Sequence, residues 1–126
     1  MKVIDRAAEW LKQEGYAPQL EDGFLAVKYQ GLTYLIPDTG DDTTFLKVDL
    51  FFPLTEYKDL SPEKALQLCN KVTQDVKIAK AVLRDESVVF AAETLVCESD
   101  KFGDLLPRLF DILGVAARYF FEENSK

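Results

Sequence analysis

Hydrophobic residues between Asp100 and Glu123 recur at three- and four-residue spacing, which predicts an amphipathic helix. Its apolar face would comprise Phe102, Leu106, Leu109, Leu113, Ala116, Ala117 and Phe120. The opposite face is charged, so the segment is expected to lie on a sheet at the protein surface. Pro107 removes one helical hydrogen bond. We therefore expect a bent or split helix, or one that starts late with Asp104 as its N-cap.

Two shorter helices are predicted earlier in the chain. Apolar residues with a 3.6-residue period begin at Val3, and Gly15 supplies a C-cap for this first helix. Ser61-Pro62-Glu63 has the serine N-cap, first-turn proline and early acid of a helix start. This second helix should run to about Thr73 to Asp75. Its buried stripe is predicted to be Ala65, Leu66, Cys69, Val72 and Val76.

From Gly23 onward the hydrophobic period changes to two, which indicates strands. A turn at Gln30-Gly31 would pair Tyr29 with Leu32 and, further along, Val27 with Tyr34 and Leu25 with Ile36. A third strand is predicted from Thr44 to Phe52, with Leu46, Val48 and Leu50 on one side and Pro53 at its end.

Residues Val76–Leu83 and Ser87–Val96 read as a second hairpin that turns at Asp85-Glu86. One face of it is rich in alanine, which would let the C-terminal helix approach closely. The predicted element order is therefore α-β-β-β-α-β-β-α, in one domain spanning residues 1–126. This order indicates an α+β fold with a five-stranded antiparallel sheet.

Composition excludes several functional classes. The 126 residues carry a formal charge of −7, and an anionic surface repels phosphate backbones and anionic lipids. We therefore expect neither nucleic acid nor membrane as a partner. The chain has no histidine, which removes histidine-based triads, general bases and zinc sites. No export-like segment begins the sequence, so a cytoplasmic protein with reduced thiols is expected.

Two local patterns are candidates for a catalytic or metal-binding role. The acidic loop 38–42 contains the Asp38-Thr39-Gly40 triplet of aspartic proteases, but the adjacent acids Asp41 and Asp42 would disturb a shared proton. Its carboxylates could bind calcium, although their spacing differs from that of an EF-hand. Cys69 and Cys97 are expected to be unreactive, the first as a small core residue. No catalytic or cofactor-binding residue is predicted.

One set of apolar residues does not fit the predicted core. The second face of the sheet would carry Phe45, Phe51, Ile78, Val82, Val89, Ala91 and Leu95 among charged side chains. If these residues are exposed, they form a patch large enough to mark a partner or dimer surface. Alternatively, a loop or the second helix of the same chain covers them.

Four segments together form a recognisable pattern: Glu21–Leu25, Tyr29–Leu32, Asn70–Val72 running into Lys77–Ala81, and Arg84–Ser87. They resemble the YbjN-type family of candidate bacterial sensory transduction regulators, which are structurally similar to type III secretion chaperones. The resemblance implies the same element order, frequent dimerisation and a non-enzymatic role in protein interaction or regulation. It brings no catalytic residues.

These observations favour a non-enzymatic domain that binds a protein partner through an apolar surface rimmed by acid, in the form of a homodimer. The alternative from another class is a small-molecule or metal-binding regulator that uses the acidic loop 38–42. An enzyme is disfavoured because the chain lacks histidine.

Overall fold

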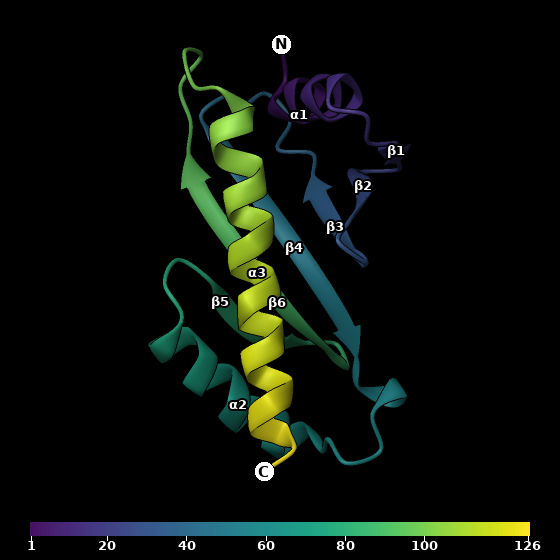
Figure 1. Cartoon of the computed structure of the whole chain (residues 1–126), viewed down its shortest axis with the longest axis vertical. Helices are drawn as coiled ribbons and strands as arrows, with labels where there is room; N and C mark the ends of the chain where they lie inside the picture. Colours follow the sequence, from purple (N-terminus) through teal and green to yellow (C-terminus); the bar gives the residue numbers. More distant parts are fainter.

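The computed structural model describes all 126 residues as an antiparallel sheet with three helices (Figure 1). The elements are α1 (Val3–Gln13), β1 (Gln19–Glu21), β2 (Phe24–Tyr29), β3 (Leu32–Pro37), β4 (Phe45–Pro53), a 3-10 turn (Leu54–Glu56), α2 (Pro62–Asp75), β5 (Lys80–Arg84), β6 (Ser87–Leu95) and α3 (Phe102–Asn124). The strand order is β1-β2-β3-β4-β6-β5. The α+β class is confirmed.

The predicted count of five strands is wrong, because the sheet has six. The additional strand, β1, has only three residues, and all three are exposed. It pairs with β2 through Leu20 and Leu25. A strand this short and this exposed has no alternating hydrophobic pattern, so nothing in its sequence distinguishes it from a loop.

Both predicted hairpins have the expected turns. Tyr29 pairs with Leu32, and the ladder continues to Leu25 with Ile36. Gln30 and Gly31 have φ angles of 49° and 84°, as a type I′ turn requires. Asp85 and Glu86 have φ angles of 54° and 89° between β5 and β6. The two-residue turns therefore fix which side chains share a face.

Strand β5 starts at Lys80 and not at Val76 as predicted. The backbone N–H of Ala79 donates to the carbonyl of Lys77 at 2.7 Å, and Ile78 between them has φ 69°. This is a γ-turn with positive φ, a rare and strained form, and it is especially unfavourable for a β-branched residue. It reverses the chain ahead of the strand.

Helix α3 runs unbroken from Phe102 to Asn124, with Lys101 at the N-cap, so the expectations of a split helix and of an Asp104 cap are wrong. Pro107 lies within the helix and leaves the carbonyl of Gly103 without its usual donor. The helix continues because its apolar face is buried along its whole length. Tertiary packing here outweighs the local cost of proline.

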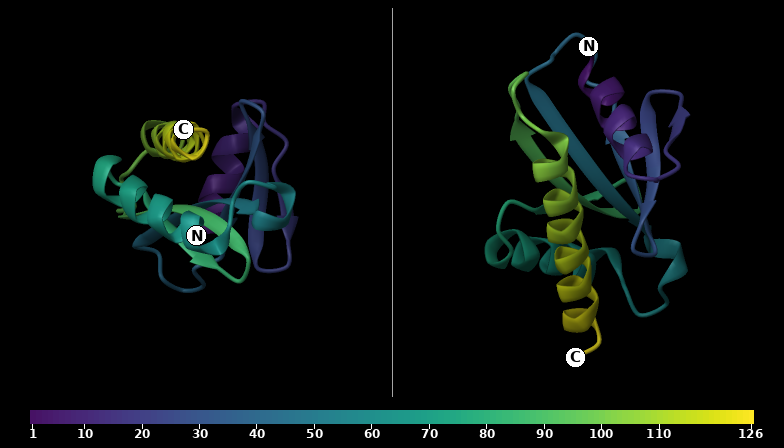
Figure 2. Two further views of the ribbon diagram at one scale, coloured as in Figure 1. Left: turned by 90° about the horizontal axis from the view of Figure 1, so that it is seen from below. Right: turned by 45° about the horizontal axis from the view of Figure 1, so that its top comes forward.

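The core lies between the sheet and the helices, and each helix contributes to it. Figure 2 shows α1 and α3 on one side of the sheet, with α2 beside α3. Phe90 of β6 is fully buried and contacts the rings of Phe52 and Phe120. Ser61 caps α2 as predicted by accepting from the backbone N–H of Lys64 at 3.1 Å.

One residue of the predicted α2 stripe lies on the other side of the helix. Leu66 is 56% exposed, whereas Leu68 takes the buried position next to Cys69. No helix of the chain combines the length and the apolar character that crossing a membrane requires.

Candidate functional site

The side of the sheet opposite the helices, here called the open face, is built from cross-strand rows. Each row contains residues that lie directly opposite one another on neighbouring strands. The rows are Val82–Val89–Phe51, Lys80–Ala91–Asp49–Leu35, Glu93–Lys47 and Leu95–Phe45. Apolar residues thus occupy both ends of the open face, and charged residues form a band between them.

No helix of the chain covers the open face (Figure 2). Val89 and Ala91 are buried, yet neither belongs to the core cluster between sheet and helices. Around them, Val82 is 39% exposed and Leu95 is 79% exposed, while Phe45 and Phe51 are half-buried. Neighbouring side chains on the same face therefore shield the two small residues, and the larger apolar groups stay in contact with solvent.

Ile78 is the one predicted surface residue that lies elsewhere. The γ-turn places it before β5, where it lines a cleft with Ile112 and Val115 of α3. Ile78 is therefore on the helix side of the molecule. The period-two pattern failed at this residue because the strand does not extend back to it.

A buried carboxylate lies at the centre of the open face. Asp49 is only 3% exposed, and its Oδ1 oxygen accepts no hydrogen bond. The nearest cation, Lys47, approaches this oxygen at 3.8 Å, too far for a hydrogen bond. Burial raises the pKa of the Asp49 carboxyl, although the charge of Lys47 acts in the opposite direction. In native proteins a buried side-chain oxygen normally accepts a hydrogen bond.

Three other charged residues of the open face, Lys80, Glu93 and Arg84, have partners within the chain. Lys80 contacts Glu93 at 2.7 Å, and this hydrogen bond lowers the pKa of the Glu93 carboxyl. The guanidinium of Arg84 lies 5.2 Å from the centre of the Phe51 ring. Asp49 thus has one cation, Lys47, within 4 Å, and its buried Oδ1 oxygen accepts no hydrogen bond.

Two of the three carboxylates of the acidic loop 38–42 accept hydrogen bonds from residues close by in the sequence. Asp38 accepts from the backbone N–H of Gly40 at 2.8 Å, and Asp42 accepts from the N–H and hydroxyl of Thr44 at 2.9 and 2.7 Å. The hydroxyl bond is the main cause of the lowered pKa of Asp42. No three acidic, cysteine or histidine side chains of the chain converge as metal ligands would. The geometry gives the metal-binding alternative no support.

The two cysteines are both free. Cys69 is buried in α2 as predicted, and burial raises the pKa of its thiol to about 11. A thiol with such a pKa is almost entirely protonated at neutral pH and is a poor nucleophile. Cys97 is exposed in the loop that follows β6.

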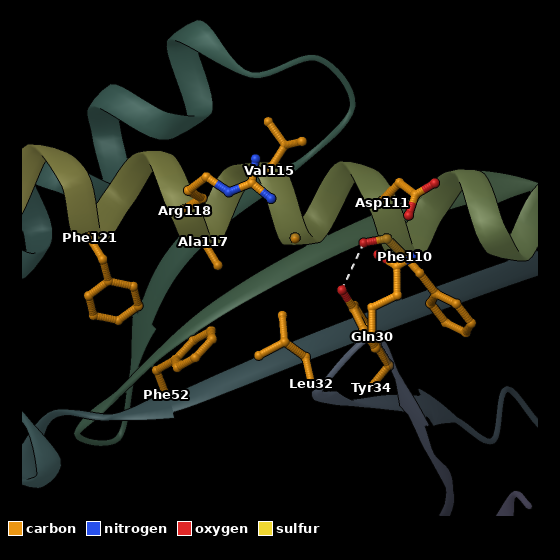
Figure 3. A pocket seen from close by; sticks show the side chains of 11 residues that line it. Gln30, Leu32, Tyr34, Phe52, Phe110, Asp111, Val115, Ala117, Arg118 and Phe121 are labelled. Atoms are coloured by element: carbon orange, nitrogen blue, oxygen red, sulfur yellow. Dashed lines mark hydrogen bonds between the residues drawn. The ribbon is translucent and has the colours of Figure 1, made fainter.

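A groove of 470 Å³ lies between α3 and the ends of β3 and β4, and sequence reasoning missed it (Figure 3). Its walls are mainly aromatic and aliphatic, with Asp111 and Arg118 at the rim. At its floor the Tyr34 hydroxyl donates to the carbonyl of Phe110 at 2.9 Å, and burial raises the pKa of Tyr34 to about 12. The groove depends on how α3 crosses the sheet, which no local pattern encodes.

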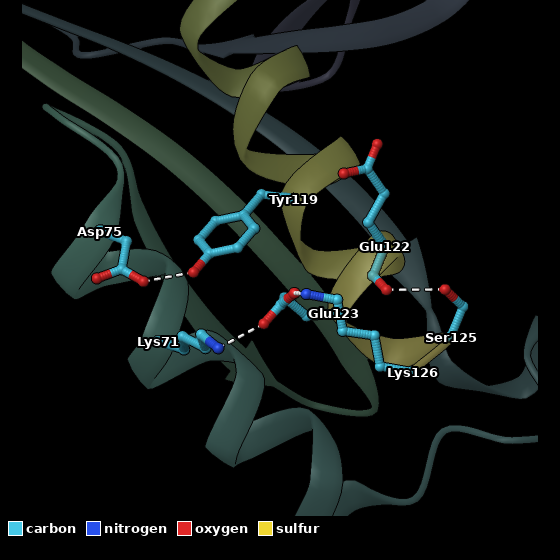
Figure 4. A network of polar contacts seen from close by, with 7 residues as sticks. All are labelled: Lys71, Asp75, Tyr119, Glu122, Glu123, Ser125 and Lys126. Carbon is cyan, nitrogen blue, oxygen red and sulfur yellow. Dashed lines mark hydrogen bonds and ion pairs between the residues drawn. The ribbon is translucent and has the colours of Figure 1, made fainter.

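The cleft beside Ile78, of 490 Å³, lies on the other side of α3. Two contacts fix the helices near it: the Tyr119 hydroxyl donates to Asp75, and Lys71 pairs with Glu123 (Figure 4). Both contacts join α2 to α3. The two depressions therefore flank a helix whose position is held by side-chain contacts as well as by the core.

The fold of this chain is similar to that of two solved structures. One is an uncharacterized protein from Methanothermobacter thermautotrophicus, with a TM-score of 0.64 at 14% identity over 96% of this chain and 95% of that chain. The other is YbjN, a candidate transcription regulator from E. coli, with a TM-score of 0.66 at 14% identity over 99% and 96% of the two chains. The resemblance to YbjN is therefore confirmed for the fold. No protein-family model and no curated protein sequence matches the chain.

Proposed function

We propose that this chain is a non-enzymatic regulatory domain that acts by binding a protein partner through the open face. The observation that carries the proposal is the buried Asp49 oxygen without a hydrogen bond, between two exposed apolar clusters. A partner surface would bury Phe51, Val82 and Leu95 and would supply a donor to Asp49. This arrangement matches a typical interface, with apolar anchors around a small number of polar contacts.

The partner is expected to be a protein. With a net charge of −7, direct contact with a phosphate backbone is unfavourable, so a regulatory role comparable to that ascribed to YbjN would be exerted through protein contacts. A partner group that donates an N–H or carries a positive charge suits Asp49 best, because a charge-assisted hydrogen bond would offset the burial of its carboxylate.

Photo-crosslinking in the native cell tests this proposal. A photoreactive amino acid is placed at Val82 on the open face or, as a matched control, at Leu66, an exposed apolar residue of α2. We expect a defined covalent adduct with one protein from position 82 and none of that protein from position 66, as identified by mass spectrometry. The same adducts from both positions, or none from position 82, would refute the proposal.

A further inference from the structure

The groove between α3 and the ends of β3 and β4, here called the aromatic groove, owes its shape to the order of residues on one side of α3. Phe110 and Phe121 lie on this side about three turns apart, roughly 16 Å along the helix axis. Gly114 and Ala117, which have the smallest side chains, lie between them. This side of the helix is therefore bulky at two points and small between them, which leaves space above the sheet.

At each end of the aromatic groove a ring of α3 meets a ring of the sheet (Figure 3). Phe110 contacts Tyr34 of β3 with ring centres 4.6 Å apart, and Phe121 contacts Phe52 of β4 with ring centres 5.1 Å apart. These two pairs leave no straight passage for an extended chain along the helix. The shape of the groove therefore suits a short molecule and not a peptide that runs through it.

The floor of the aromatic groove suits an apolar occupant. The Tyr34 hydroxyl gives its proton to the carbonyl of Phe110 at 2.9 Å, so an apolar group can cover this hydroxyl without leaving a buried donor unpaired. A Cβ added to Gly114 would lie 3.3 Å from the Tyr34 hydroxyl oxygen, so a larger residue there would narrow the groove at its floor. Glycine is unfavourable inside a helix relative to alanine, but at this position it keeps the space open.

The rim of the aromatic groove carries one cation without a partner. Arg118 is exposed and forms no ion pair and no side-chain hydrogen bond. Asp111, the acid of the rim, already accepts a hydrogen bond from the Tyr29 hydroxyl at 3.0 Å. The guanidinium of Arg118 is therefore the free charge of the groove, and its planar fork of N–H donors matches the geometry of a carboxylate.

We propose that the aromatic groove binds a small aromatic carboxylate, with its rings between α3 and the sheet and its carboxylate on Arg118. The volume of 470 Å³ lies within the range of small-molecule sites, roughly 300 to 1,000 Å³. Walls of phenylalanine and tyrosine favour a flat ring, because aromatic pairs gain energy beyond the burial of their surface. The net charge of −7 repels anions in general, so only a carboxylate that reaches Arg118 and also fills the groove would be retained.

Titration of the isotope-labelled protein with 2-naphthoate, followed by NMR, tests the proposal. The backbone amide signals of Leu32, Gly114 and Ala117, which line the groove, should shift with a Kd below roughly 1 mM, as expected for a ligand of this size. The neutral analogue 2-naphthamide has the same rings and should bind about tenfold more weakly, because it lacks the charge that strengthens hydrogen bonds to Arg118. Acetate has the charge without the rings and should leave these signals unchanged at the same concentrations.

Two arginine variants test the role assigned to the rim. Arg118→Gln should bind 2-naphthoate about tenfold more weakly than wild type and should bind 2-naphthamide equally well. Arg108→Gln is the matched control, because Arg108 is also exposed on α3 but lines the cleft beside Ile78 on the other side of the helix. This variant should bind both compounds as wild type does. Both substitutions are at exposed positions, so circular dichroism should show an unchanged fold.

Four results would overturn the proposal: no shift of the groove signals, shifts at the Ile78 cleft instead, equal affinity for 2-naphthoate and 2-naphthamide, or equal losses in the two arginine variants. The tripeptide Gly-Gly-Phe with a free C-terminus distinguishes a small molecule from a chain end. It should bind more weakly than 2-naphthoate, and tighter binding would contradict the small-molecule assignment. Crosslinking from position 82 reports on the open face, so failure of the groove leaves the partner surface testable.

Discussion

Alternate residues of strand β6 meet two different environments. Phe90 points towards the helices, where the rings of Phe52 and Phe120 enclose it. Its neighbour Val89 points to the open face and is buried only by side chains of the same sheet, since no helix lies over it. The same strand thus contributes to the stability of the fold on one face and presents a surface on the other. Burial of a residue alone does not tell these two roles apart.

The largest loss of stability is expected from a substitution on the helix side of the sheet. Phe90→Ala removes a fully buried ring from the core and should lower the free energy of unfolding by about 3 to 5 kcal/mol. Chemical denaturation followed by circular dichroism measures this loss. Val88→Ala on the helix side and Val89→Ala on the open face remove the same two methyl groups, and the open-face change should cost clearly less because Val89 lies outside the core cluster. Equal losses would mean that the two faces do not differ as described.

The next effect concerns the turn that keeps each side chain of β2 and β3 on its face. Gly31→Val forces a β-branched residue into positive φ and should cost on the order of 1 to 3 kcal/mol. No atom lies within 4 Å of a Cβ added there, so strain and not collision causes the loss. Gly31→Asn, which tolerates this φ, is the control. A denaturation midpoint equal to that of wild type for Gly31→Val would contradict the type I′ turn.

A smaller effect on stability is expected at Asp49, where the substitution should stabilise the protein. Asp49→Asn removes a buried carboxylate without a hydrogen bond and should raise stability at neutral pH by about 1 kcal/mol. The same change should weaken partner binding, since the proposed acceptor is lost. Thermal unfolding of both proteins at pH 7 checks the first outcome, and a variant less stable than wild type would contradict it.

The stability difference between wild type and Asp49→Asn should depend on pH, and the pKa of Asp49 determines how. Because burial raises this pKa in the folded state, the native protein binds the proton more tightly than the unfolded chain. Wild-type stability relative to Asp49→Asn therefore increases as the pH falls through the folded-state pKa towards the unfolded value of about 3.9. The extra stability of Asp49→Asn relative to wild type should be largest at neutral pH and should become smaller in acid. An advantage that grows on acidification would mean that the carboxylate is stabilised by its cations.

Much of the fold was predictable because local rules and tertiary packing agree. The two hairpins follow from strict alternation and short turns, and Ser61 marks the start of α2 by its cap. The failures have local causes. Strand β1 is too short for a pattern, and Ile78 adopts a strained turn that its residue type disfavours. Pro107 is tolerated because the apolar face of α3 is buried along the helix.

The candidate site was predictable only in part. Alternation along β4, β5 and β6 identified one face, because side chains of a strand alternate by geometry; its residues are Phe45, Phe51, Val82, Val89 and Leu95. The role of Asp49 could not be predicted, since its burial depends on neighbours from three strands. The groove and the cleft beside α3 depend on helix position, which only the assembled structure defines.

The smallest effect on stability tests the central claim most directly. Val82→Glu puts a charge at a residue that is 39% exposed on the open face, so the free energy of unfolding should change by less than about 1 kcal/mol. The affinity for the partner identified by crosslinking from position 82, measured by calorimetry, should fall at least tenfold, by roughly 1.4 kcal/mol or more. A folded variant that binds this partner as tightly as wild type does would contradict the account.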